Sequence, residues 1–213
     1  MTKKQIVERI REVFDVVYED AKCSLDFETP HQLLVAVQLS AQCTDARVNL
    51  VTPALFEKYR SVQDFANADE DELCHMIKSC GFYKNKGKNI IASSKRILSE
   101  FMGEIPSEMD ELLKLEGVGR KTANLILGDV YGKPSLVIDT HAIRLTNRIG
   151  LVSEKDPVKI EFALKKIVPS DYQTRFCHQL VYHGRAICDA RVPKCTLCPI
   201  GDVCKKKNVK KFV

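Results

Sequence analysis

Apolar residues recur at helical spacing along most of this chain, and this pattern constrains the fold more than any other feature. The first apolar face consists of Ile6, Ile10, Val13 and Val17. Their intervals are those of residues stacked on one side of an α-helix. No segment alternates apolar and polar residues as a half-buried strand does, and no Asn-Gly turn marks a hairpin. The chain is therefore predicted to be all-α.

Residues 29–39 predict a central buried helix. Thr29 can cap the helix, Pro30 suits its first position, and Gln32 completes a capping box. The run from Leu33 to Leu39 is apolar on all sides, as in a helix surrounded by protein. A buried strand is the competing interpretation, and the cap favours the helix. Two further capped starts are predicted at Asp69 with Glu72 and at Ser107 with Asp110.

Composition limits the classes of function. The apolar runs are too short to span a bilayer and no signal peptide opens the chain, so we expect a soluble intracellular protein without a membrane partner. The net charge of +5 permits a polyanionic partner without requiring one. The most basic stretch runs from Lys205 to Lys211, and a stretch of this kind is more often a solvated end than a binding site.

Four of the nine cysteines crowd together: Cys188, Cys195, Cys198 and Cys204. An odd total with five scattered members does not resemble a disulfide framework, so the crowded four predict a metal site. Structural zinc sites usually offer two close pairs, and only Cys195 and Cys198 form a C-x2-C pair here. Four thiolates also suit a [4Fe–4S] cluster, and the spacing alone leaves both metals open.

A glycine-containing turn separates two helical patterns at residues 116–119. Gly117 and Gly119 allow positive φ angles and a close approach by another backbone. Amide N–H groups at the start of the helix that follows make an anion site, and for a basic protein the obvious anion is a nucleic-acid phosphate. A plain helix–helix turn is the alternative interpretation of the same residues.

Five segments in order resemble signatures of the endonuclease III family of DNA glycosylases. They are Leu115–Ala123, which is similar to its helix-hairpin-helix; Val137–His141, its aspartate segment; the C-x6-C-x2-C-x5-C cysteines; Ser40–Asp45; and Gly81–Tyr83. The match is colinear from about residue 5 to about residue 205. One departure is Glu116, where the family usually has proline, and a carboxylate there opposes phosphate binding unless it points away.

The resemblance implies a glycosylase with AP lyase activity, in which Lys121 attacks C1′ of the damaged nucleotide to form a Schiff base. Asp139 stabilises the developing cation and assists proton transfers. From its position before a helical pattern, Asp139 is also predicted to be an N-cap. Without the family, Lys121 reads as a solvated or phosphate-binding lysine.

The resemblance further implies duplex DNA as partner and a [4Fe–4S] cluster of architectural role on the four crowded cysteines. Gln42 inserts into the duplex and Phe82 wedges beside the unpaired base; taken alone, the first reads as buried polar and the second as core. Phosphate contacts are expected from a wider set: Lys84, Lys86, Lys88, Gly117, Gly119, Arg120, Arg191 and Lys194. For the three lysines at 84–88, an exposed solvated loop is the alternative.

The implied architecture has two helical subdomains that flank a cleft. Residues 22–132 form a helical barrel with the hairpin, and residues 1–21 with 133–213 form the cluster domain. The expected protein is a monomer that acts on DNA with damaged pyrimidines or abasic sites. Two alternatives remain. One is an adenine–mismatch glycosylase, against which Lys121 and the short C-terminal part argue; the other is a non-catalytic helix-hairpin-helix protein, which has no need for the pair of Lys121 and Asp139.

Overall fold

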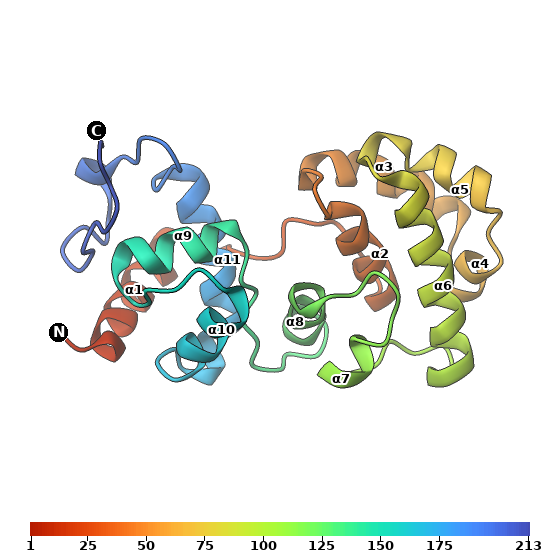
Figure 1. The fold of residues 1–213 in the computed structure, drawn as a ribbon, viewed down its shortest axis with the longest axis horizontal. Helices are drawn as coiled ribbons and strands as arrows, with labels where there is room; N and C mark the ends of the chain where they lie inside the picture. The colour runs from red at the N-terminus through yellow and green to blue at the C-terminus, as the bar shows by residue number, and fades with distance from the viewer. The chain divides into compact units, whose positions relative to one another are not determined.

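The computed structural model describes residues 1–213 and contains helices and loops without a single strand (Figure 1). The all-α prediction is confirmed. The chain separates into two compact units, residues 23–132 and residues 1–22 with 133–213. No helix is both long enough and apolar enough to cross a membrane.

The unit of residues 23–132 is built around one buried helix. Its elements are α2 (Pro30–Ser40), α3 (Asp45–Lys58), α4 (Val62–Ala66), α5 (Glu70–Met76), η1 (Lys78–Cys80), α6 (Tyr83–Phe101), α7 (Met109–Leu112) and α8 (Arg120–Asp129). Helix α2 packs against α3, α6 and α8. All side chains from Leu33 to Leu39 are buried, as predicted. Burying one leucine contributes about 1.5–3 kcal/mol, so this helix contributes substantially to the unit's hydrophobic stability.

Local capping chemistry sets where several helices begin. Thr29 Oγ1 accepts from the backbone N–H of Gln32 at 3.2 Å, and the Gln32 side chain accepts from the Thr29 N–H at 3.3 Å. The Asp69 carboxylate likewise accepts from the Glu72 N–H at 2.9 Å. These two caps are confirmed. The third is wrong, because α7 begins at Met109 with Glu108 as its N-cap residue.

The second unit combines the beginning and the end of the described chain. Its elements are α1 (Lys3–Val17), α9 (Thr140–Ile149), α10 (Pro157–Lys165), η2 (Ser170–Tyr172), α11 (Gln173–Ala186) and η3 (Cys195–Leu197). The buried face of α1 differs from the predicted one, because Val17 is 50% exposed while Phe14 is fully buried. The Phe14 ring lies 4.9 Å from the His183 ring, so the larger aromatic surface decides which side of α1 faces the core.

Candidate functional site

Two exposed turns in the unit of residues 23–132 carry residues in the left-handed region. Gln42 has φ 54° and Phe82 has φ 48°. This conformation costs a residue other than glycine about 1–2 kcal/mol. Phe82 is 64% exposed, and Gln42 is exposed too. Interpretation of either residue as buried is therefore wrong, and both side chains are presented to the surroundings at an energetic cost.

The three lysines after Phe82 lie on helix α6 and not in a loop. Lys84 and Lys88 are exposed. Lys86 is buried, and its Nζ donates to the carbonyl oxygens of Leu39 at 2.7 Å and Cys80 at 2.9 Å. Burial lowers the pKa of this amine. The predicted phosphate contact of Lys86 is wrong, and its role is to join the end of α2 to the end of η1.

The turn before α8 adopts the helix-hairpin-helix geometry with one positive φ angle. Gly117 has φ 74°, and a Cβ there would meet the Asn89 side chain at 2.9 Å. Gly119 is the N-cap of α8 with φ −100°, so only Gly117 uses the positive φ that both glycines allow. Lys121 is the second residue of α8, and its side chain is exposed.

The carboxylate of Glu116 is paired within this unit. Its Oε1 accepts from Arg96 Nη2 at 2.7 Å, and the same arginine binds Glu100. Hydrogen bonding to Arg96 lowers the pKa of Glu116. The Glu116 carbonyl oxygen accepts from Gln38 Nε2 at 2.7 Å. The residue that replaces the family's proline is thus tied to α6 through its side chain and to α2 through its backbone.

Asp139 is the N-cap of α9, as predicted. Its Oδ1 accepts from the backbone N–H of Ala142 at 2.7 Å, and the side chain is half-buried. One carboxylate oxygen is therefore held by the helix terminus. Asp139 belongs to the unit with residues 133–213, whereas Lys121 belongs to the unit of residues 23–132.

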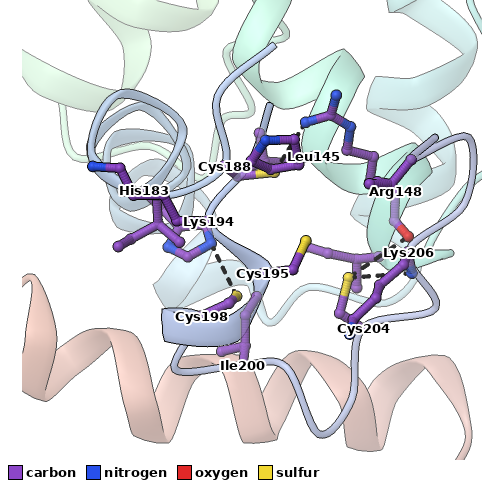
Figure 2. A pocket seen from close by; sticks show the side chains of 14 residues that line it. Leu145, Arg148, His183, Cys188, Lys194, Cys195, Cys198, Ile200, Cys204 and Lys206 are labelled. Atoms are coloured by element: carbon purple, nitrogen blue, oxygen red, sulfur yellow. Dashed lines mark hydrogen bonds between the residues drawn. The ribbon is translucent and has the colours of Figure 1, made fainter. Parts of the chain in front are cut away.

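The four crowded cysteines line one pocket, with about 370 Å³ of empty space including the part open to solvent (Figure 2). No three His, Cys, Asp or Glu residues are grouped as they would be around a single metal ion. Nitrogen groups approach several of the sulfurs. Arg148 Nη1 donates to Cys188 Sγ at 3.4 Å, the Lys206 N–H donates to Cys204 Sγ at 3.4 Å, and His183 Nε2 lies 3.6 Å from Cys198 Sγ.

Two arginines on one face of α9 hold the loop that begins at Cys188. Arg144 donates to the carbonyl oxygens of Gly184 and Cys188, and Arg148 donates to those of Asp189 at 2.6 Å and Ala190 at 2.8 Å. Neither arginine belongs to a motif or charge cluster in the sequence. Their i, i+4 spacing on a capped helix is the signal that could have identified a shared face.

The two predicted phosphate-binding residues of this loop are exposed. Arg191 follows a turn in which the Asp189 carboxylate accepts the N–H groups of Arg191 at 2.7 Å and Val192 at 3.2 Å. Lys194 is exposed, with its Nζ 3.1 Å from the Ala186 carbonyl oxygen. Both cations can therefore meet a solvent-borne anion.

A helical fold with a hairpin, an N-capping aspartate and a cysteine-lined pocket places this chain in a recognised class. Residues 35–170 match the model of the HhH-GPD superfamily of base excision DNA repair proteins. Endonuclease III of Synechocystis sp. is 46% identical over 204 residues, which cover 95% of this chain and 93% of that protein.

Solved structures agree with the sequence relatives. A non-covalent endonuclease III–DNA complex has a TM-score of 0.90 at 39% identity and covers 97% of this chain and 96% of that one. A trapped covalent endonuclease III–DNA intermediate has the same TM-score of 0.90 at 40% identity, with 97% of each chain covered. The chain belongs to the endonuclease III family of base-excision repair enzymes, which act as DNA glycosylases and AP lyases.

Proposed function

We propose that this enzyme removes oxidised pyrimidines of the thymine glycol type from duplex DNA and then cleaves the strand, with Lys121 as the nucleophile. The observation that carries the proposal is an exposed primary amine at the second position of α8, directly after the hairpin turn. Backbone N–H groups at this helix start attract phosphate, which brings the DNA backbone to the amine. A trapped covalent DNA intermediate is known for a relative 40% identical to this chain.

The proposed chemistry needs a nucleophile and a carboxylate. Lys121 Nζ in its neutral form attacks C1′, and the glycosidic bond breaks with its electron pair leaving on the base, which takes up a proton. The sugar ring then opens as the C1′–O4′ bond breaks and O4′ takes up a proton, which leaves an iminium at C1′. The iminium acidifies C2′, and loss of a C2′ proton expels the 3′ phosphate. Asp139 stabilises the cationic sugar and relays protons, and its cap bond to Ala142 fixes the aim of the carboxylate.

The proposed DNA contacts fall on the surfaces described above. Gln42 enters the duplex and Phe82 wedges at the extruded base, since both are exposed and held in costly conformations. Phosphate contacts come from Lys84, Gly117, Gly119, Arg120, Arg191 and Lys194. Lys86 is not among them, because its amine is already bound to two carbonyl oxygens.

The cysteine pocket fits a [4Fe–4S] cluster bound by Cys188, Cys195, Cys198 and Cys204. The four cysteines line one pocket and are not grouped around the position of a single metal ion. N–H groups of Arg148 and Lys206 donate to two of the sulfurs. Such hydrogen bonds stabilise thiolate ligands. When bound, the cluster supplies cross-linking of the loop, and no chemistry at the damaged base depends on it.

Borohydride trapping tests the proposal. Duplexes carrying a thymine glycol, an abasic site or no lesion are incubated with wild type, Lys121→Ala and, as a matched control, Lys114→Ala, which removes another exposed lysine of the same unit. We expect covalent adducts on both lesions with wild type and Lys114→Ala, and none with Lys121→Ala.

Two results would overturn parts of the proposal. An adduct on the abasic site alone keeps the lyase chemistry and contradicts the substrate. If wild type with a full iron content traps neither lesion, the assignment of Lys121 is wrong, and a non-catalytic DNA-binding role takes its place.

A further inference from the structure

The segment of residues 205–213 is the one basic stretch to which the proposed function assigns no role. It contains five lysines: Lys205, Lys206, Lys207, Lys210 and Lys211. Over residues 186–213 the chain carries seven basic residues and two acidic ones, Asp189 and Asp202. The Asp189 carboxylate accepts backbone N–H groups, and Asp202 pairs with Arg9 at 3.2 Å. Both acids are therefore engaged, and the lysines dominate the local charge.

Backbone hydrogen bonds hold this segment at both ends. The Lys205 N–H donates to the Ile149 carbonyl oxygen at 3.2 Å, and the Lys207 N–H donates to that of Arg148 at 2.9 Å. At the far end, the Val213 N–H donates to the Pro193 carbonyl oxygen at 3.1 Å, and the Val213 carbonyl oxygen accepts from the Thr196 N–H at 3.1 Å. A segment with these bonds is not a free solvated end.

The same contacts place the segment beside the 189–194 loop. Arg148 joins the two, because its guanidinium donates to Asp189 and Ala190 while its own carbonyl oxygen accepts from Lys207. Lys206 and Val209 line the cysteine pocket, so the segment forms part of the pocket wall (Figure 2). The lysines are thus held near the exposed cations of the loop and share its support.

Three of the five lysine side chains form no ion pair and no ring contact. Lys206 Nζ lies 4.9 Å from the centre of the Phe212 ring, and the Lys205 side chain packs over Gly150. Lys207, Lys210 and Lys211 are exposed, and none has a carboxylate partner. Unpaired ammonium groups on a segment whose backbone is already held bind a polyanion without the entropy cost of ordering a flexible chain.

We propose that the 205–213 segment is a second phosphate-binding surface, continuous with the 189–194 loop, which grips the backbone of duplex DNA independently of base sequence. The inference rests on the proposed function for its choice of polyanion and deepens it. The segment, which from its sequence is expected to be a solvated end, thereby extends the surface that contacts DNA.

The test compares two triple variants. One is Lys207→Gln, Lys210→Gln and Lys211→Gln, which spares every lysine that lines the pocket. The matched control is Lys3→Gln, Lys155→Gln and Lys166→Gln, which removes the same charge from exposed residues of the same unit that form no ion pair. Anisotropy of a labelled duplex with a tetrahydrofuran abasic analogue is measured between 50 and 300 mM KCl.

Each lost phosphate contact lowers the slope of log K against log salt by about 0.9, so we expect the slope to fall by about 2–3. Across the sixfold salt range, the loss of affinity at 50 mM KCl should therefore be about 40- to 200-fold larger than the loss at 300 mM KCl. The control keeps the wild-type slope. A third variant with arginine at the three positions restores both values, because charge and not lysine itself is needed. Iron content equal to wild type shows that the pocket is intact.

A slope and affinity in the glutamine variant equal to those of the control overturn the inference. The proposed function is tested separately by borohydride trapping on wild type. If wild type is trapped and the glutamine variant keeps the wild-type slope, only the proposal of a second surface is wrong. If wild type is not trapped but the glutamine variant has a reduced slope, the segment binds DNA in a protein without the proposed chemistry.

Discussion

At the scale of single residues, Asp139 combines two tasks that substitution can separate. Asparagine caps a helix about as well as aspartate, so Asp139→Asn keeps the bond to the Ala142 N–H, whereas Asp139→Ala loses about 1 kcal/mol of stability. Because asparagine cannot accept a proton or stabilise a cation, we expect Schiff-base trapping by Asp139→Asn to slow about 100-fold or more. Urea unfolding measures the effect on stability, and trapping rates measure the effect on catalysis. If Asp139→Asn is trapped as fast as wild type, Asp139 acts only as a helix cap.

The two hairpin glycines differ in what they require. Gly117→Ala forces a side chain into φ 74° and against Asn89, so we expect it to cost about 1–3 kcal/mol and to weaken DNA binding. Gly119→Ala meets nothing within 4 Å at an ordinary φ, so it serves as the comparison and should lose only the cap preference of glycine over alanine, about 0.5–1 kcal/mol. Equal unfolding midpoints for both variants would contradict the strain argument.

The residues that sequence analysis located correctly follow from local rules. Capping by Thr29 and Asp139 depends on neighbours within three positions, so the sequence contains the information. The prediction for Lys86 was wrong because a lysine between two other lysines is expected to be exposed to solvent. Its carbonyl partner on Leu39 lies 47 positions away, and no local pattern encodes that contact.

At the scale of elements, Lys86 fastens the end of α2 to the end of η1. Lys86→Met fills a similar volume and removes both hydrogen bonds, which leaves two buried carbonyl oxygens to find other donors. We expect a loss of about 1–3 kcal/mol in the free energy of unfolding. Lys84→Met, an exposed position on the same helix, is the control and should change stability by less than about 0.5 kcal/mol. Identical urea midpoints would show that the bonds contribute nothing.

The start of α2 carries a buried histidine that makes stability depend on pH. Burial lowers the pKa of His31 to about 4, and its Nε2 lies 3.0 Å from Ser94 Oγ. The unfolded chain, with a pKa near 6.5, then binds more protons than the native one between these values, so stability falls as pH decreases through that window. From pH 7 to pH 5 we expect His31 to account for about 2 kcal/mol of this loss.

His31→Gln cannot titrate, so its unfolding free energy should fall less steeply over the same range. The other titrating groups are common to both proteins and cancel in the difference. The measurement is urea unfolding of both proteins at several pH values from 7 to 5. Parallel curves would mean that His31 is accessible to protons in the native state.

The helical structure and the helix starts at Thr29, Asp69 and Asp139 were predictable because spacing and caps are local, but the buried faces of the helices were less predictable. The apolar positions of α1 allow Phe14 or Val17 to face the core, and tertiary contact with His183 selects Phe14. The cysteine spacing predicted a metal site but not its wall. Arg148 of α9 and the 205–213 segment complete that wall, and the contacts of Arg148 with the 189–194 loop and of this segment with α9 span from about 40 to about 60 positions.

At the scale of the whole molecule, each unit has its own hydrophobic core, and only one of them adjoins the cysteine pocket. The core of the first unit is drawn from residues 25–127 and that of the second from residues 6–14 and 136–203. Within residues 187–213 the only helical element is η3, so a bound cluster has to supply much of the order there. The two units should therefore respond differently to loss of the cluster.

Cys195→Ala with Cys198→Ala removes two proposed ligands, and hydrogen–deuterium exchange reports the result by segment. We expect protection to fall across residues 187–213 and at the ends of α9 and α11, whose Ile149 and His183 line the pocket, while α2 and α6 keep theirs. Cys177→Ala, a buried cysteine of the same unit outside the pocket, should leave the pattern intact. Equal loss in both units would instead mean that the chain unfolds as one cooperative body, in which the cluster stabilises the helices around Lys121 as much as those around Asp139.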